Sequence, residues 1–346
     1  MDLSSKDRHI IDDCTGNYLV LGRVTDFPIS RTYHAQGTGD YSTIQNQHKG
    51  QDKLLMSEIH FLTEVYKRHT FDTPFLCIYA GACPCTHLKT LTVKFPNVFF
   101  LLIDPRFREF QARQLAIENY GRVMVCPEYF NDHTANAIQD FVWNNNSPGK
   151  YHWVKEALQR CRNIVRKSAT GCDVSFFDSK TILFENLLFV SDIRIDARNE
   201  LSIAKEMTSQ GQWFRIVDAT AGLLKFRLPY IKKTDNSGEG TKAPVMSLQG
   251  DVCLPIFGPK STTECRLLVR RNCKDRMYDP EIHEEIMAGF NASERKLCYA
   301  YKNKYYKTFD DFAHEVVHDN YRKMIQNQRR DGNLYNTPRN FLEHGL

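Results

Sequence analysis

The sequence predicts an α/β fold in which a doubly wound sheet is flanked by helices. The stretch from Phe75 to Asp104 reads as an apolar strand, a small-residue turn, an amphipathic helix, a second apolar strand and a carboxylate, which is the order of a βαβ unit. Further apolar runs alternate with helical patterns, as is typical of parallel sheets. Of the 346 residues, 42% are hydrophobic and 25% are charged, so the chain can bury a sizeable core.

The composition restricts the class of protein. No apolar run approaches the ~18 residues that a membrane-spanning helix needs, and the N-terminus has no apolar signal core. The eleven cysteines include no C-x-x-C pair, which argues against a disulfide framework and a zinc ribbon and indicates a reducing compartment. The net charge of +5 permits a polyanionic partner without requiring one. We therefore expect a protein of the cytosol or nucleus that does not bind membranes.

The first 50 residues are polar and irregular, and we expect a flexible N-terminal arm over 1–50. Tyr33 and Tyr41 lie in this arm, where exposed aromatic rings either stack on a base or make local packing contacts. From Asp52 to His69 apolar residues recur at helical spacing. Lys53 falls in the first turn of this predicted helix, where the helix dipole disfavours a cation. It is either an ordinary solvated residue or placed there for a purpose.

The turn after the first apolar run carries one glycine, Gly81, and the second run ends in Asp104, 23 residues later. An acid about 20 residues after such a turn can accept both ribose hydroxyls of a nucleoside. Because the turn lacks a G-x-G-x-x-G pattern, it suits an adenosine ligand without phosphates, such as S-adenosylmethionine, better than a dinucleotide. An ordinary buried βαβ unit shows the same pattern, so both interpretations stay open.

The rest of the chain continues the alternation with one interruption. Residues 143–186 contain a basic amphipathic helix, which either covers the core or contacts RNA or an acidic partner. Lys225 lies inside a predicted strand, where a charged residue is rare unless it is paired or functional. Strands are predicted at 122–126, 186–190 and 222–228 and within 257–269, and helices at 131–142, 198–212 and 305–326.

A short zinc-like pattern needs separate consideration. His314, Glu315 and His318 match H-E-x-x-H, which on a helix places two imidazoles on one face. The next residue is the charged Asp319, and no H-x-x-G-x-x-H extension follows. We interpret these side chains as solvated helix residues and expect no metal site.

Four polar residues interrupt or end apolar elements around the predicted nucleoside site: Lys53, Asp192, Lys225 and Glu264, which read K-D-K-E. This ordered tetrad is the signature of RNA ribose 2′-O-methyltransferases. The chain resembles the poxvirus family of cap-specific mRNA (nucleoside-2′-O-)-methyltransferases, which also serve as the small subunit of the viral poly(A) polymerase. The resemblance lies in the strings GQDKLLMSEIHFL, IYAGACPCTHL, LLID-x-R, VSDIR, LLKFRLPY and TECRLL, and spans about Gly50 to Met287 with gaps.

The resemblance implies a Rossmann-like S-adenosylmethionine-dependent methyltransferase domain over 51–300, with a basic helical insertion at 143–186 and a C-terminal helical tail over 301–346. It implies transfer of a methyl group from S-adenosylmethionine to the ribose 2′-OH of the first transcribed nucleotide or nucleotides of 7-methylguanosine-capped mRNA. The implied partners are capped mRNA and a poly(A) polymerase catalytic subunit or another RNA-processing protein. The implied location is the virion and host cytoplasm for a viral protein, or the nucleus for a cellular one.

The resemblance also implies which residues form the cofactor site. Cys85 departs from the family because it replaces a glycine beside the cofactor, where its side chain either crowds the methionine portion or fills a gap. The residues implied to line the cofactor are Gln51, Tyr79, Gly81, Cys85, Asp104, Arg106 and Asp192.

The cap site is implied in the same way. Tyr230 would stack on one face of the 7-methylguanine, Glu284 would hydrogen-bond its edge, and a tyrosine of the arm, Tyr33 or Tyr41, would stack on the other face. Two departures affect this site. Lys232 replaces an acid of the family and Ser261 replaces a tyrosine.

The chemistry of methyl transfer fits the tetrad. A ribose hydroxyl must lose its proton as it attacks the methyl group of a sulfonium, so a base is needed. A lysine is a base only when its pKa is depressed, and both desolvation and a neighbouring cation act in that direction. Lys225, inside an apolar run and with Lys53 as the second cation, suits this role. Asp192 and Glu264 would orient the lysines and balance their charge.

Two other functions compete with cap methylation. One is a 2′-O-methyltransferase of uncapped RNA, against which Tyr230 and Glu284 argue. The other is a non-catalytic cap- or RNA-binding subunit that confers processivity on a polymerase, against which the intact K-D-K-E tetrad argues.

Overall fold

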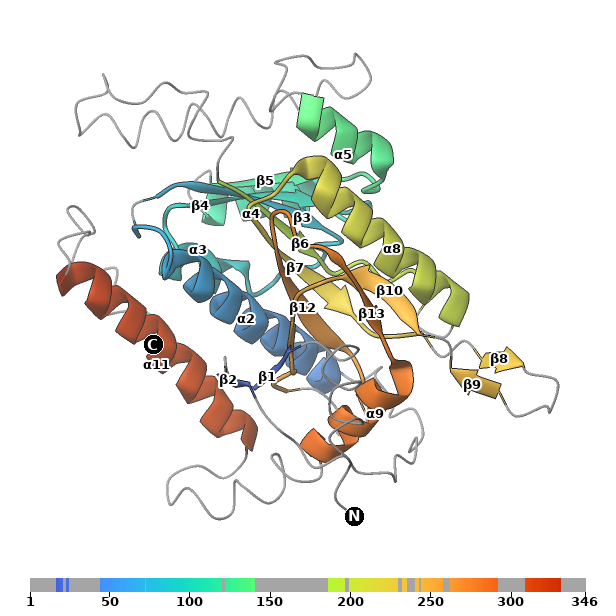
Figure 1. Cartoon of the computed structure of the whole chain (residues 1–346). Helices are drawn as coiled ribbons and strands as arrows, with labels where there is room; N and C mark the ends of the chain where they lie inside the picture. Colours follow the sequence, from blue (N-terminus) through green and yellow to red (C-terminus); the bar gives the residue numbers. More distant parts are fainter. Residues whose placement is uncertain are drawn as a thin grey trace. The chain divides into compact units, whose positions relative to one another are not determined.

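The computed structural model describes two compact units with mixed α/β content (Figure 1). Unit 1 comprises Met1–Thr63, Arg194–Thr208 and Lys225–Lys323, and unit 2 comprises Glu64–Ile193, Ser209–Leu224 and Met324–Leu346. The residues that the structure describes are 17–20, 23–24, 44–71, 73–119, 122–140, 186–196, 199–229, 232–234, 240–242, 244–257, 262–291 and 309–330.

Unit 2 contains a parallel sheet. Every residue of β3 and β4 is buried, as expected for strands that are covered on both faces. All neighbouring strand pairs are parallel, and the strand order β7-β6-β3-β4-β5 reverses between β3 and β6. The strands are β3 (Phe75–Ala80), β4 (Val98–Ile103), β5 (Val123–Cys126), β6 (Leu187–Ser191) and β7 (Ala221–Phe226), whose last two residues belong to unit 1.

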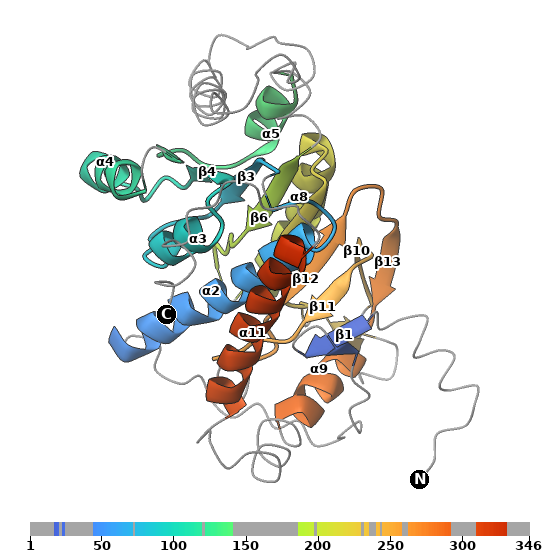
Figure 2. The same ribbon diagram turned by 90° about the vertical axis from the view of Figure 1, so that its left-hand side faces the viewer.

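Helices α3 (Leu88–Lys94) and α4 (Glu109–Glu118) connect β3 to β4 and β4 to β5. Crossovers between parallel strands are right-handed, so two crossovers in the same direction place their helices on one face of the sheet. Helix α5 (Asp132–Gln139) lies on the other face (Figure 2). Arg122 Nη1 donates hydrogen bonds to the carbonyl oxygens of Thr92 (2.6 Å) and Pro96 (3.0 Å). These bonds satisfy one carbonyl in the last turn of α3 and one in the loop that follows it.

The opposite face of this sheet carries α5 (Asp132–Gln139) and the unit 2 part of α8 (Glu200–Val217). Trp213 Nε1 donates a hydrogen bond of 2.6 Å to Oδ1 of Asp132. The ring of Phe130 packs edge-on against Trp213 with centroids 5.2 Å apart. These contacts fasten α5 to α8.

Unit 1 contains a second set of strands, in the order β2-β1-β11-β12-β7. β1 pairs parallel with β11, and β11 pairs antiparallel with β12. The elements are β1 (Asn17–Val20), β2 (Arg23–Val24), β11 (Asp251–Cys253) and β12 (Cys265–Arg270), with the antiparallel pairs β8 (Lys232–Thr234) with β9 (Gly240–Lys242) and β10 (Val245–Leu248) with β13 (Asp275–Tyr278).

Helix α9 (Pro280–Gly289) follows β13 directly. Asp279 caps it by accepting hydrogen bonds from the backbone N–H groups of Glu281 (2.8 Å) and Ile282 (3.3 Å). Pro280 occupies the first helical turn, where its missing N–H costs nothing. Two longer helices, α2 (Ile44–Tyr66) and α11 (Phe309–Arg330), each contribute residues to both units.

The predicted strands at Phe75–Ala80 and Val98–Ile103 are confirmed at the same bounds. The mixed α/β class with a mostly parallel sheet and flanking helices is also confirmed. The first predicted helix begins at Ile44 rather than at Asp52. The prediction that Lys53 lies in a first turn is therefore wrong, and the helix dipole does not bear on it, since the dipole acts only within a terminal turn.

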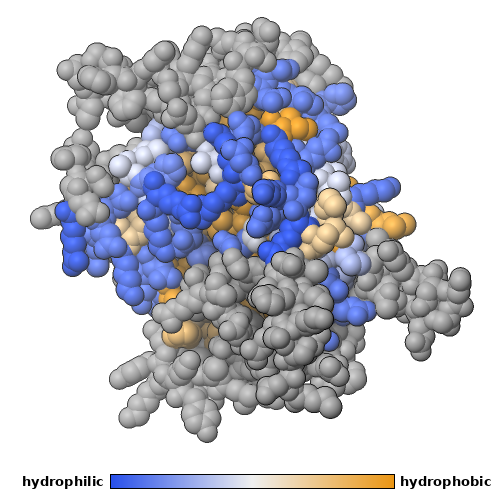
Figure 3. Space-filling model, viewed as in Figure 1, coloured by the Kyte–Doolittle hydropathy of each residue, from blue (hydrophilic) through white to orange (hydrophobic). Residues whose placement is uncertain are grey.

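Hydrophilic residues cover much of the coloured surface in Figure 3. The large apolar side chains exposed in the described part of the chain are Tyr129, Ile195, Leu201, Met246 and Met277. Met246 and Met277 are register partners of β10 and β13. Among the helices of the described residues, none combines the length and apolar character needed to span a membrane.

Candidate functional site

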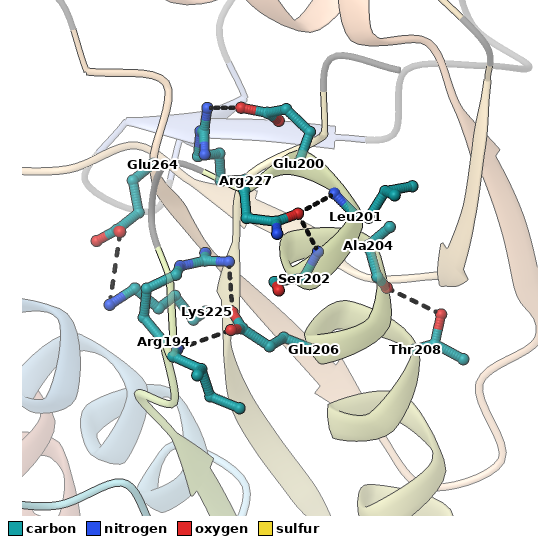
Figure 4. Close-up of polar contacts among 12 residues, drawn as sticks. Arg194, Glu200, Leu201, Ser202, Ala204, Glu206, Thr208, Lys225, Arg227 and Glu264 are labelled. Atoms are coloured by element: carbon teal, nitrogen blue, oxygen red, sulfur yellow. Dashed lines mark hydrogen bonds and ion pairs between the residues drawn. The ribbon is translucent and has the colours of Figure 1, made fainter.

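A cluster of charged side chains in unit 1 surrounds Glu264, the residue before β12. Lys53 Nζ donates a hydrogen bond of 2.6 Å to Oε1 of Glu264. Lys225 Nζ lies 3.5 Å from Oε2 of the same carboxylate (Figure 4). Arg266 Nη2 is 4.0 Å from Oε1. Three cations therefore approach the same carboxylate.

The cluster is partly shielded from water. The exposed fractions of the Lys53, Lys225 and Glu264 side chains are 16%, 11% and 20%. Burial acts to raise the pKa of the Glu264 carboxyl, but the positive charges of the two lysines and Arg266 outweigh it and hold this pKa well below the ordinary value. Glu264 is therefore ionised at neutral pH.

The structure thus brings together three of the four predicted tetrad residues. Sequence analysis missed Arg266. Like Lys225, it is a charged residue inside an apolar strand, and this feature could have identified it. Only 5% of the Arg266 side chain is exposed. Burial of a charged side chain is costly unless it is paired, and Glu264 supplies the partner.

Two further ion pairs in unit 1 join arginines to α8 (Figure 4). Arg194 Nη1 lies 2.8 Å from Oε2 of Glu206, and these side chains are only 9% and 4% exposed. Oε1 of Glu206 also accepts a hydrogen bond of 2.7 Å from the backbone N–H of Ile195. Arg227 Nη2 lies 2.7 Å from Oε1 of Glu200. Helix α8 therefore fixes the backbone that follows both β6 and β7.

Asp192 and Lys225 occupy corresponding places in these two strands. Ser191 of β6 and Leu224 of β7 are register partners. Asp192 directly follows the first, and Lys225 directly follows the second. The backbone N–H of Asp192 donates a hydrogen bond of 3.0 Å to the carbonyl oxygen of Ala80. Asp192 thus continues the pairing of β6 with β3 by one residue.

In unit 2, Gly81 shapes the turn after β3. Its φ is +74°, and an added Cβ would lie 2.8 Å from Cγ1 and 2.9 Å from the backbone N of Ile193. Glycine is the residue that tolerates both the left-handed backbone and this approach. The glycine is therefore explained by the neighbouring end of β6, without reference to a ligand.

Asp104 follows β4 and is buried, with a side chain 3% exposed. Its Oδ1 accepts hydrogen bonds from the backbone N (2.9 Å) and Nε (3.0 Å) of Arg106, and its Oδ2 accepts from Nη2 of Arg106 (2.7 Å) and the backbone N of Cys83 (3.1 Å). A carboxylate offers about four acceptor positions. Ribose hydroxyls would therefore have to replace the guanidinium of Arg106, whose side chain is 66% exposed and so has room to leave.

Gly81, Asp104 and Asp192 each follow a parallel strand of unit 2 directly. The carboxyl ends of parallel strands lie at one edge of a sheet, and ligands of doubly wound sheets bind there, where the strand order reverses. The pKa of Arg106 is raised, chiefly by its hydrogen bonds with Asp104, and the charge of Asp192 contributes. The structure therefore groups these predicted cofactor residues at one sheet edge, where the Asp104 carboxylate could accept hydrogen bonds from ribose hydroxyls if Arg106 moved away.

The remaining predicted cofactor residues are Tyr79, Cys85 and Gln51. Tyr79 is 1% exposed within β3, and Cys85 is fully buried. The φ of Cys85 is +51°, a left-handed conformation that favours glycine, as the resemblance implied for this position. Gln51 belongs to α2 in unit 1.

The predicted cap site is described only at Glu284, which is half-buried in α9, and at Lys232, which begins β8. The remaining predicted positions lie outside the described residues: Tyr33, Tyr41, Tyr230, Ser261 and nearly all of the insertion at 143–186.

The H-E-x-x-H residues lie on α11, and the rings of His314 and His318 are 4.4 Å apart between centroids. Glu315 Oε2 lies 3.5 Å from Nη2 of Arg322. Across the described ranges, no group of three or more histidine, cysteine, aspartate or glutamate side chains is arranged to hold a metal ion.

Comparison with known proteins gives one family. A family described as "Poly A polymerase regulatory subunit" matches residues 25–147. This range contains Lys53, Gly81, Asp104 and Arg106 and ends before the other tetrad residues. A comparison with curated proteins finds no match. Over these residues the chain is therefore similar to regulatory subunits of poly(A) polymerase.

Proposed function

We propose that this protein is an mRNA-processing subunit that associates with the catalytic subunit of a poly(A) polymerase. The support is the family match over residues 25–147. Because the match ends before Asp192, Lys225 and Glu264, it supports association with the polymerase and says nothing of catalysis.

We further propose that the protein transfers a methyl group from S-adenosylmethionine to the ribose 2′-OH of the first transcribed nucleotide or nucleotides of 7-methylguanosine-capped mRNA. The observation that carries this proposal is the contact of both lysines with Glu264. Lys53 and Glu264 are 211 residues apart in sequence, so they do not pair merely because they are neighbours in the chain. The K-D-K-E order relates the pair to methyl transfer, since this order is the signature of ribose 2′-O-methyltransferases.

In this proposal the sheet of unit 2 is Rossmann-like and holds S-adenosylmethionine at the strand ends. Asp104 would accept the ribose hydroxyls, and the Gly81 turn would lie against the nucleoside. The cofactor supplies an electrophilic methyl group on a sulfonium. Arg106 would release Asp104 when the nucleoside binds, and its guanidinium would then be available to an anionic group of the ligand.

The lysines have different roles in the proposed reaction. Lys53 makes the shorter contact with Glu264, at 2.6 Å against 3.5 Å for Lys225. Lys53 would therefore balance the carboxylate, and Lys225 in its neutral form would take the proton of the ribose hydroxyl. Removing a proton at a positioned lysine is ordinary general-base catalysis. Tyr230 and Glu284 would hold the methylated base of the cap.

The test of methylation is transfer of labelled methyl to short RNAs that carry a 7-methylguanosine cap, an unmethylated guanosine cap or a 5′-triphosphate. Lys225→Ala should abolish transfer, while Lys67→Ala, which removes an exposed lysine directly after α2, should leave it unchanged. Activity on the first RNA alone supports cap methylation, and equal activity on all three supports a methyltransferase of uncapped RNA. Absence of transfer in the wild type would overturn the catalytic proposal.

Association with the polymerase is tested separately. The protein should co-purify with the poly(A) polymerase catalytic subunit of the same source and change the length of the tails that it adds. Lys225→Ala should keep both properties, because the family match does not include Lys225. Failure to co-purify would overturn the regulatory proposal. The methylation proposal would not be affected, because its assay is independent of the polymerase.

A further inference from the structure

Helix α9 packs against the segment that carries Glu264. His283 and Met287 are four residues apart and so share one face of α9. His283 Nε2 is 2.8 Å from the carbonyl oxygen of Thr263, and Met287 Sδ is 3.3 Å from Sγ of Cys265. The two contacts meet the residues on either side of Glu264. α9 therefore packs against both neighbours of Glu264, and the hydrogen bond from His283 is the stronger of the two contacts, since a thiol and a thioether form only a weak one.

The chemical state of His283 is defined by its surroundings. It is 1% exposed, and burial lowers its pKa to about 4, although the hydrogen bond to Thr263 opposes this. The ring is therefore neutral at physiological pH. Because a carbonyl oxygen only accepts hydrogen bonds, Nε2 carries the proton and donates it to Thr263.

The same imidazole also contacts the strand that carries Lys225. The rings of His283 and Phe226 lie 5.5 Å apart between centroids at an interplanar angle of 85°. Phe226 directly follows Lys225, and Thr263 directly precedes Glu264. One buried side chain thus touches the neighbours of both members of the ion pair.

We propose that His283 is a positioning residue that sets the separation of Lys225 and Glu264. Its role in catalysis rests on the proposed methyl transfer, whereas its role in the ion pair does not. The hydrogen bond to Thr263 fixes Glu264, and the edge-on ring contact fixes Lys225. Misplacement of a reacting group by about 1 Å costs on the order of a hundredfold in rate, so a loosened pair should lower kcat strongly.

The variants separate positioning from packing. His283→Phe keeps an aromatic ring and removes the donor, and Phe226→Leu removes the ring contact and leaves the donor. His283→Gln keeps a side-chain N–H and should restore part of the effect. Met287→Leu is the matched control, since it changes packing on the same face of α9 with nearly constant volume.

The first readout does not need activity. The Glu264 carboxyl is followed by carbon NMR in labelled protein from about pH 3 to about pH 7. In the wild type and Met287→Leu it should stay ionised over most of this range. In His283→Phe and Phe226→Leu it should titrate at higher pH, because the cations lie farther away. If the Glu264 carboxyl titrates at the same pH in all four proteins, the proposal is overturned. If His283→Phe fails to fold, Phe226→Leu still provides the test.

The second readout is methyl transfer. His283→Phe should lower kcat roughly ten- to a hundredfold and leave KM for S-adenosylmethionine unchanged, with partial recovery in His283→Gln. A change in KM alone would contradict positioning. If the wild type transfers no methyl group, the proposed methylation fails, while the titration still decides whether His283 sets the ion pair.

Discussion

Lys53 Nζ donates to Oε1 of Glu264 across 2.6 Å, which joins the middle of α2 to the start of β12. The contact is long-range in sequence and partly buried, and Lys225 and Arg266 extend it. The same carboxylate therefore serves both the stability of unit 1 and the proposed chemistry.

Replacing Glu264 by glutamine should destabilise the protein by about 2–4 kcal/mol, because three clustered cations lose their shared carboxylate while the side-chain shape is kept. The measurement is the free energy of unfolding in urea. Glu64→Gln breaks an exposed pair with Lys67 and should cost less than about 1 kcal/mol. Equal losses in the two variants would contradict the importance of the cluster.

His283 should make stability depend on pH. Its pKa is lowered from 6.5 to about 4 in the folded state, so the unfolded chain binds the proton more readily. The stabilisation is complete above pH 6.5 and is lost as the pH falls toward 4, by about 3 kcal/mol in all.

Unfolding of the wild type and His283→Gln at a series of pH values tests this expectation. The difference in stability between them should shrink as the pH falls from 6.5 to 4, since glutamine does not titrate. A constant difference across this range would show that His283 is not held neutral.

Gly81→Ala should destabilise the protein by about 2–4 kcal/mol, since the new Cβ would meet the backbone of Ile193 in a left-handed conformation. Gly50→Ala is the matched control, because no atom lies within 4 Å of the added carbon. As Gly50 lies inside α2, that change should stabilise by about 0.5–1 kcal/mol. Thermal unfolding of both variants gives the comparison, and a neutral Gly81→Ala would contradict the close approach.

Arg106→Ala should lower stability by about 1–2 kcal/mol, because buried Asp104 loses its two side-chain hydrogen bonds. Adenosine should then raise the melting temperature more in this variant than in the wild type, since its ribose no longer competes with the guanidinium. Arg108→Ala, which removes a nearby exposed arginine, should behave as the wild type. An equal adenosine effect in all three proteins would argue against a nucleoside at Asp104.

Local patterns predicted the central strands of unit 2 well, because strands buried on both faces appear as continuous apolar runs. Short strands such as β11 and β13 carry too few residues for a period to show. Helix α9 was not predicted, although Asp279 followed by Pro280 is a recognisable start signal. Its ten residues make fewer than three turns, which is too short for a helical period to stand out.

The tetrad lysines and Glu264 were predicted to act together, and the structure places them in contact. The roles of Arg266 and His283 could not be predicted, since both depend on which distant segments meet. His283 lies 20 residues from its hydrogen-bond partner Thr263. Nor does the sequence show that the guanidinium of Arg106 hydrogen-bonds the carboxylate of Asp104. The side chains of two residues so close in the chain can also point away from each other.

The hydrogen bond between Trp213 and Asp132 gives unit 2 an optical reporter. The indole is 8% exposed, and its N–H is held by a carboxylate on the neighbouring helix. The chain has three tryptophans, so changing Trp143 and Trp153 to phenylalanine leaves Trp213 as the only tryptophan whose fluorescence is observed. Separation of α5 from α8 would expose this indole to water and shift its fluorescence to longer wavelengths, which makes loosening of this face visible in real time.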